Sequence, residues 1–163
     1  MPTPIRRRSG LLWLLLPWLL ACSAHPRVAA PRAEQEIRGL TQHYAELVLA
    51  MDSAGIAALF TADGEVAADG QAPIHGPAAI RAHLETFKDY HVLAESLTAD
   101  RIAVAGSTGH VVGTYHQRVR LPSGEVVEVG GTYTADWVRD PTGAWHIQRM
   151  ATVAQKAPGR PKG

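Results

Sequence analysis

The residues best suited to chemistry are a tyrosine on an apolar helix stripe and a polar set on one long strand. Tyr44 lies on the apolar side of an amphipathic helix. Its hydroxyl could bond a ligand, or Tyr44 could be a core residue whose hydroxyl lies at the edge of the core. On the strand predicted for residues 108–121, the face that carries His116 is opposite the face of Tyr115 and Gln117. If the first face lines a pocket, His116 could act as a general base. If the second does, Tyr115 and Gln117 line it.

Aromatic and polar residues on the next two strands extend this set. Tyr133 and Trp137 share a strand face with Ala135, and we expect them to wall a cavity. Gln148 stands on the last strand. Together with Tyr44, the residues Tyr133, Trp137 and Gln148 form the predicted ligand-binding set.

Metal and cofactor motifs are missing from the sequence. His110 and His116 are six residues apart on one strand, which is too far for one ion at ~3.3 Å per residue, and no carboxylate cluster completes a site. The chain also has no Gly-x-Ser-x-Gly elbow, phosphate loop or dinucleotide fingerprint. We therefore expect neither a metal nor a cofactor.

The N-terminus has the pattern of an export signal. A basic triplet at residues 6–8 precedes an apolar run at residues 11–21, which is shorter than the roughly 20 residues that a spanning helix needs. The sequence LLAC, ending at Cys22, resembles the lipobox of bacterial lipoproteins, in which the cysteine receives a diacylglyceryl group and becomes the mature N-terminus. The alternative is an ordinary signal peptide cleaved after Ala24.

We favour the lipobox because Cys22 is the only cysteine in the chain and so has no partner for a disulfide. Residues 1–21 are then a lipoprotein signal peptide, and Cys22 is the lipidation site that holds the protein on a membrane of the bacterial cell envelope. By resemblance to the sorting pattern of Gram-negative lipoproteins, Ser23 after the cysteine favours the outer membrane, with the protein facing the periplasm.

The remaining chain divides into a tether, one domain and a tail. Residues 22–32 have the Pro/Ala composition of a tether, and residues 156–163 that of a disordered tail. Residues 33–155 form one domain of a size that buries a core without disulfides. This domain has eight Lys and Arg against fifteen Asp and Glu, a net charge of −7. An acidic domain offers no basic face to nucleic acid, so we expect no such partner.

Periodicity predicts an α+β layout, with helices first and strands afterwards. An amphipathic helix covers residues 33–51, a short helix residues 53–60, and Gly76-Pro77 opens a third. Between the second and third helices, Asp63-Gly64 and Asp69-Gly70 should form the turns of a small hairpin. The period then changes to two over four strands joined by turn residues, at 91–105, 108–121, 125–139 and 144–154. One face of this antiparallel sheet should pack on the helices.

Three segments resemble the SnoaL-like branch of the nuclear transport factor 2-like superfamily. YAELVLAMDSAGIAALFTADG at residues 44–64 is similar to the family's first helix, acidic break and second helix. IHGPAAIR at residues 74–81 is similar to its third helix, and GTYTADWVRDPTGAWHI at residues 131–147 to its last hairpin. The resemblance implies a cone, in which a curved antiparallel sheet packs on a long N-terminal helix and two shorter helices. Such cones commonly pair through their sheets, so a homodimer is expected.

A comparison with the ketosteroid isomerases of this superfamily weighs against steroid isomerisation. Tyr44 falls at the family's oxyanion-holding tyrosine. The family's base falls on Ala68, with Asp69 one residue away, on the opposite strand face or in the turn before Gly70. The second acid falls near Ala135, with Asp136 again one step off. Tyr44, Asp69 and His116 remain as catalytic candidates.

The sequence thus favours an envelope lipoprotein whose SnoaL-like domain binds a small, largely apolar ligand. The alternative is a cyclase- or isomerase-type enzyme that uses acid/base residues in the same pocket. A carboxylate or histidine within hydrogen-bond reach of Tyr44 at the pocket floor would favour the enzyme. Without such a group, binding is favoured.

Overall fold

The computed structural model describes residues 29–68 and 70–155. The signal peptide, Cys22, most of the expected tether, Asp69 and the tail at residues 156–163 lie outside the described residues. Helix α1 (Ala29–Leu49) begins at Ala29 rather than Ala33, so the last part of the expected tether is its first turn. Within the described part of the chain, no helix combines the length and apolarity needed to cross a membrane.

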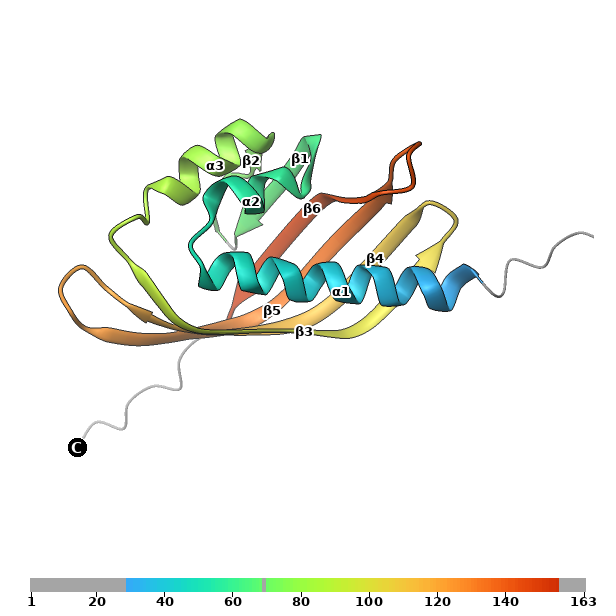
Figure 1. The fold of residues 1–163 in the computed structure, drawn as a ribbon. Coiled ribbons are helices and arrows are strands. Elements are labelled where there is room, and N and C mark those ends of the chain that lie inside the picture. Colours follow the sequence, from blue (N-terminus) through green and yellow to red (C-terminus); the bar gives the residue numbers. More distant parts are fainter. Residues whose placement is uncertain (1–28, 69, 156–163) are drawn as a thin grey trace, which may run out of the picture.

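Helix α1 lies lengthwise over the inner face of a curved sheet (Figure 1). Its 21 residues give it a length of ~30 Å. Ala33, Ile37 and Thr41 are buried at four-residue spacing, and Tyr44 and Val48 continue the same stripe against the core. One side of this helix therefore covers the sheet from end to end.

Two short helices cover the rest of the inner face. The chain leaves α1 through Met51, whose φ of 55° turns it sharply, and α2 (Ser53–Ala58) begins after Asp52, whose carboxylate accepts a hydrogen bond from the Gly55 N–H at 2.8 Å. Helix α3 (Pro77–Glu85) begins at proline, as predicted, where the missing N–H costs nothing. Both short helices lie beside α1 on the same side of the sheet (Figure 1).

The six strands form one open sheet in the order β2-β1-β6-β5-β4-β3. The strands are β1 (Phe60–Ala68), β2 (Ile74–His75), β3 (His91–Ala105), β4 (Thr108–Arg120), β5 (Val126–Arg139) and β6 (Trp145–Ala154). The four long strands match the predicted ones to within one residue, which confirms the α+β cone. The sheet is not wholly antiparallel, because β1 pairs with β6 in parallel. Asp63 and Gly64, expected in a turn, lie within β1 at an irregularity of that pairing.

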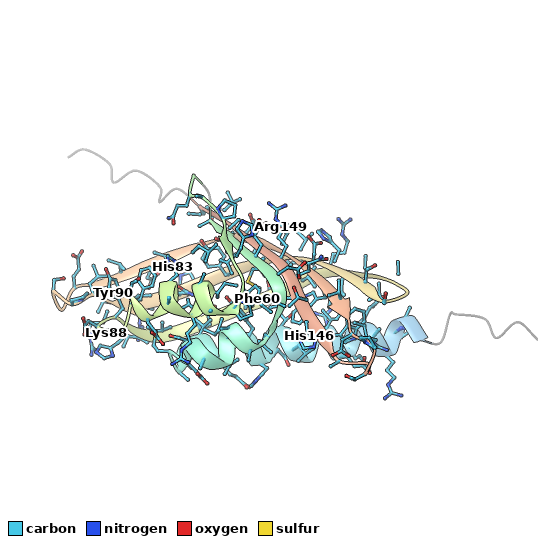
Figure 2. All side chains as sticks on the ribbon, turned by 90° about the horizontal axis from the view of Figure 1, so that it is seen from above. Phe60, His83, Lys88, Tyr90, His146 and Arg149 are labelled. Carbon is cyan, nitrogen blue, oxygen red and sulfur yellow. The ribbon has the colours of Figure 1, made fainter. Side chains whose placement is uncertain are left out.

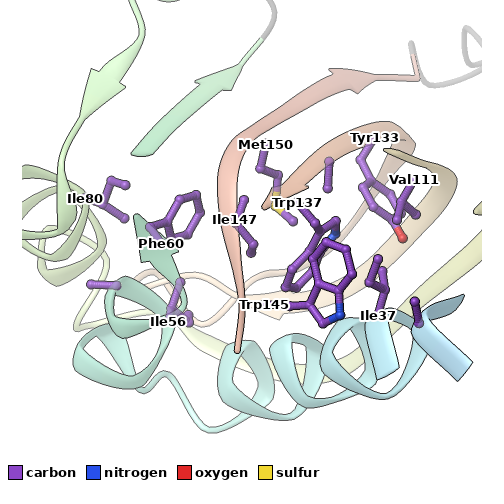
Figure 3. Packing of buried hydrophobic residues seen from close by; sticks show 13 residues of the cluster. Ile37, Ile56, Phe60, Ile80, Val111, Tyr133, Trp137, Trp145, Ile147 and Met150 are labelled. Carbon is purple, nitrogen blue, oxygen red and sulfur yellow. The ribbon is translucent and has the colours of Figure 1, made fainter. Parts of the chain in front are cut away.

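The core lies beneath the N-terminal half of α1 and beside α2. Figure 3 shows Trp137, Tyr133 and Val111 of the sheet facing Ile37 of α1, with Ile147 nearby. Trp137 and Tyr133 are only 1% and 2% exposed. The large side chains thus fill one end of the cone.

A polar cluster fixes the same end of α1 to the sheet. The Glu36 carboxylate accepts hydrogen bonds from the Arg139 guanidinium and from the Trp145 indole N–H, the latter at 3.1 Å. The Arg139 guanidinium also lies 4.6 Å from the centroid of the Trp145 ring. Further along, Arg38 donates to the Ala99 carbonyl of β3 at 2.8 Å. With its N-terminal half held in this way, α1 presents its C-terminal half to the other end of the cone.

Candidate ligand-binding cavity

A cavity of about 380 Å³ occupies the end of the cone away from the core. It lies between the C-terminal half of α1, helices α2 and α3, and the inner faces of β3, β4 and β5. In Figure 2 the labelled Tyr90 marks this end of the molecule, well away from His146. Most lining side chains are aliphatic or aromatic: Tyr44, Val48, Met51, Ser53, Ile56, Leu84, Phe87, Tyr90, Val92, Gln117, Val119, Leu121, Val127 and Val129. This composition suits a small, largely apolar molecule.

The polar floor of the cavity comes from α1 and β4. Tyr44 and Gln117 both line it. Glu95 of β3 stands beside Gln117 as its direct partner in the antiparallel ladder. Oxygen Oε2 of Glu95 is closed off from solvent and has no hydrogen-bond partner. A carboxyl group therefore lies next to the cavity-lining Gln117.

Burial dominates the electrostatics of this floor. Removal from water raises the pKa of Glu95 to about 7, while the neighbouring Gln117 and His116 act in the opposite direction. Burial also raises the pKa of Tyr44 well above its usual value, and the charge of Glu95 is the second cause. The pKa of Tyr115 is raised by the same two causes. Tyr44 thus remains a neutral hydroxyl that can both donate and accept a hydrogen bond.

A β-bulge explains why an acid faces inward on β3. Val92 pairs with Val119, but Ala94 pairs with Arg118, so one extra residue stands between them. The strand's alternation is shifted at that point, and Glu95 and Leu97 then face the helices, as Val92 does. Without the bulge, strict alternation from Val92 would turn Glu95 outward.

The structure separates the candidates that the sequence placed on β4. The inner face of β4 carries Tyr115 and Gln117, which is the second of the two alternatives that the sequence left open. His116 is exposed on the outer face. His116 Nε2 lies 3.3 Å from the Glu128 carboxylate, on the neighbouring strand β5. Because successive side chains of a strand point to opposite faces, His116 does not reach the cavity and cannot act there as a base.

Of the four predicted ligand-binding residues, only Tyr44 lines this cavity. Tyr133 and Trp137 do face the helices, but they are packed into the core at the other end of the cone. Gln148 is exposed on β6, in a shallow outer groove where His110 Nδ1 lies 2.6 Å from Asp136 Oδ1. Tyr133 and Trp137 lie apart from Tyr44 because the long strands extend past both regions, so residues on one face can lie far apart along it.

Glu95 was missed, although the sequence contains a signal for it. It stands two residues before Leu97 in a strand of alternating character, and a carboxylate on the same strand face as a leucine marks a polar group on a buried face. Asp69, the remaining candidate, lies outside the described residues. Within residues 29–68 and 70–155, no group of three or more His, Cys, Asp or Glu side chains could hold a metal ion.

The family model described as SnoaL-like domain matches residues 30–151. The chain therefore belongs to the SnoaL-like domain family, and the resemblance drawn from its three sequence segments is confirmed. No curated protein is similar enough in sequence to count as a relative.

Solved structures share the fold at low sequence identity. A nuclear transport factor 2-like protein with a cystatin-like fold from Novosphingobium aromaticivorans is 23% identical, with a TM-score of 0.68, over 86% of this chain and 92% of that one. A protein of unknown function from Mycobacterium tuberculosis is 19% identical, with a TM-score of 0.72, over 82% and 78%. A ketosteroid isomerase-like protein from Erwinia carotovora atroseptica is 14% identical, with a TM-score of 0.65, over 74% and 93%. At these identities the similarity concerns the fold alone.

Proposed function

We propose that this protein is a lipid-anchored lipoprotein of the bacterial cell envelope whose SnoaL-like domain binds a small, largely apolar ligand. The ligand's apolar body lies against the aliphatic and aromatic walls of the cavity, and its polar end lies against Tyr44 and Gln117. The anchor rests on the lipobox ending at Cys22. The binding proposal rests on the cavity.

One observation carries the binding proposal: among the described residues that line the cavity there is no Asp, Glu, His, Lys or Arg. General acid/base chemistry needs a titratable group within hydrogen-bond reach of the reacting atom. Glu95, the cross-strand partner of Gln117, does not line the cavity, and its Oε2 atom is enclosed. A cavity with apolar walls and a neutral polar floor is equipped to hold a molecule rather than to exchange protons with it.

The proposal is tested by native mass spectrometry of the purified full chain. We expect a co-purified small molecule whose mass adduct disappears when the cavity is filled by Val119→Phe, a substitution on the inner face of β4. Val112→Phe, on the outer face of the same strand, is the matched control and should keep the adduct. An adduct that survives Val119→Phe but not Val112→Phe would place the ligand elsewhere and contradict the proposal.

Tyr44→Phe tests the polar floor separately. The change removes one oxygen from a packed ring, so the fold should persist while ligand affinity falls by ~1 kcal/mol, the usual worth of a neutral hydrogen bond. Affinity is measured by calorimetry with the ligand recovered from the adduct. Unchanged affinity would remove Tyr44 from the site and leave it as a core residue.

A cyclase- or isomerase-type enzyme is the second candidate, and one observation favours it. Burial raises the pKa of Glu95 to about 7, a value suited to a general acid or base at neutral pH. A base of this kind exchanges the protons next to a bound ketone's carbonyl, so deuterium uptake into benzylacetone in heavy water, abolished by Glu95→Gln, would support catalysis. Uptake equal to that in buffer would leave the protein as a binder.

A further inference from the structure

The end of α1 has a backbone conformation that glycine normally supplies. The Met51 N–H bonds to the Val48 carbonyl at 3.0 Å, and the Asp52 N–H bonds to the Leu47 carbonyl at 2.9 Å, which is the Schellman pattern of a helix C-terminus. Its left-handed position, usually a glycine, is occupied by Met51 with a φ of 55°. A side chain crowds the backbone in this conformation, so methionine is strained here where glycine would not be.

The chain uses glycine at the other described positions that need a positive φ. Within residues 29–68 and 70–155 these are Gly70, Gly76, Gly106, Gly124 and Gly143, and Met51 is the exception. A strained conformation of this kind persists where the surrounding structure holds it in place, and such positions gather at ligand sites. The strain at Met51 therefore points to a role for its side chain.

Neither the helix end nor the core accounts for the Met51 side chain. In a Schellman end, the residue that packs back on the helix is the one after the left-handed position, which here is Asp52. The hydrophobic side chains packed against the buried core include Tyr44 and Val48 but not Met51. Met51 is half-buried and lines the cavity. Its surroundings are thus the binding site rather than the core.

Met51 is also the last cavity residue along α1. Tyr44, Val48 and Met51 all line the cavity. Tyr44 and Val48 share one side of the helix, and Met51 follows where the helix ends. The rise along the helix from Tyr44 to Met51 is ~10 Å. A ligand whose polar end lies against Tyr44 and whose body follows α1 therefore passes Val48 and meets Met51.

We propose that Met51 is a specificity residue that limits the length of the ligand's apolar body. The cavity takes uncharged amphiphilic molecules whose body ends at the last turn of α1, and the flexible, polarisable thioether side chain packs against the end of that body. Longer molecules meet the Met51 side chain and are excluded. The strained backbone places a large side chain at this point, which glycine could not do. This inference rests on the proposed binding function.

Straight-chain alcohols test the length limit, since they differ only in length and their hydroxyl can bond Tyr44. Extended octanol spans about the ~10 Å rise from Tyr44 to Met51, hexanol is shorter and decanol is longer. Dissociation constants are measured by calorimetry on the full chain. We expect octanol to bind roughly tenfold more tightly than hexanol, because more CH₂ groups are buried, and decanol to bind no more tightly than octanol.

Met51→Ala and Met51→Gly should remove the limit, so that decanol binds at least about fivefold more tightly than octanol. Leu49→Ala is the matched control, because Leu49 is 47% exposed and does not line the cavity, and it should keep the wild-type order. A merely structural loss would weaken octanol and decanol equally, so the ratio of the two affinities reports specificity. A ratio unchanged by both Met51 substitutions overturns the inference.

Melting temperatures test the strain separately. Glycine fits the left-handed position and alanine does not, so Met51→Gly should melt about 4 °C above Met51→Ala. Equal melting temperatures would mean that the position is unstrained and would also overturn the inference. If Met51→Ala does not fold, Met51→Gly decides the length limit alone. If the wild type binds none of the alcohols, the proposed function fails together with this inference; if they bind and the ratio is unchanged in the variants, only this inference fails.

Discussion

The buried position of Glu95 predicts a loss of stability between weakly acid and neutral pH. In the unfolded chain its pKa has the ordinary value of 4.5, and in the fold it is about 7. Below the lower value both states are protonated, so Glu95 contributes no pH dependence. Between the two values the folded state holds a proton that the unfolded state has lost, so the free energy of unfolding falls as pH rises.

The size of this effect follows from the same two values. A difference from 4.5 to about 7 corresponds to roughly 3 kcal/mol. Glu95 is only partly buried, and solvent screening reduces the expected loss to about 1.5 kcal/mol. Above the folded-state value the loss is complete and stays constant.

The assay is urea unfolding of the wild type and Glu95→Gln at several pH values from about 4.5 to 8.5. Glu95→Gln has no carboxyl to ionise, so the difference in unfolding free energy between the two proteins should change in its favour by about 1.5 kcal/mol over that range. Glu125→Gln, at an exposed position before β5, is the control and should follow the wild type. Parallel curves for the wild type and Glu95→Gln would refute the inward, desolvated placement of Glu95.

Three further predictions concern the anchor, the assembly and the fold. Cys22→Ser should abolish incorporation of radiolabelled fatty acid and leave the protein unprocessed, whereas equal labelling would contradict the lipobox; fractionation of the wild type to the outer membrane tests the role of Ser23. The sheet's outer face, where Val153 is 52% exposed, should pair with a second copy, and light scattering that shows a monomer at high micromolar concentration would count against a homodimer. Asp52→Ala removes the cap that bonds the Gly55 N–H, and thermal unfolding should show a loss of ~1 kcal/mol.

The elements could be predicted from the sequence because their causes are local. Alternation and turn residues define β3 to β6, and the apolar stripe that includes Ile37 defines α1. The proline at residue 77 marks the start of α3. Each of these features depends on residues a few positions apart, so the strand bounds were correct to within one residue. The parallel pairing of β1 with β6 joins distant segments and leaves no such local pattern.

The site was harder to predict because it depends on face and on position along the strands. Both faces of β4 mix polar and apolar residues, so only the packed structure shows that Gln117 faces inward and His116 outward. Tyr133 and Trp137 face the correct side but belong to the core end. Glu95 faces inward only because of the bulge before it, and a bulge is set by how two strands pair rather than by either sequence alone.

The same bulge lets the chain change its length without losing the polar floor. Leu93 is the one extra residue between the Val92–Val119 and Ala94–Arg118 pairs. If it were deleted, Ala94 would follow Val92 directly and keep Arg118 as its partner, while Glu95 would keep Gln117, so strict alternation would still turn Glu95 inward. A one-residue deletion in the gene at this position would thus straighten the strand and leave the acid beside the pocket. In this cone, the bulge is a place where the chain can shorten by one residue while the residues on either side keep their faces.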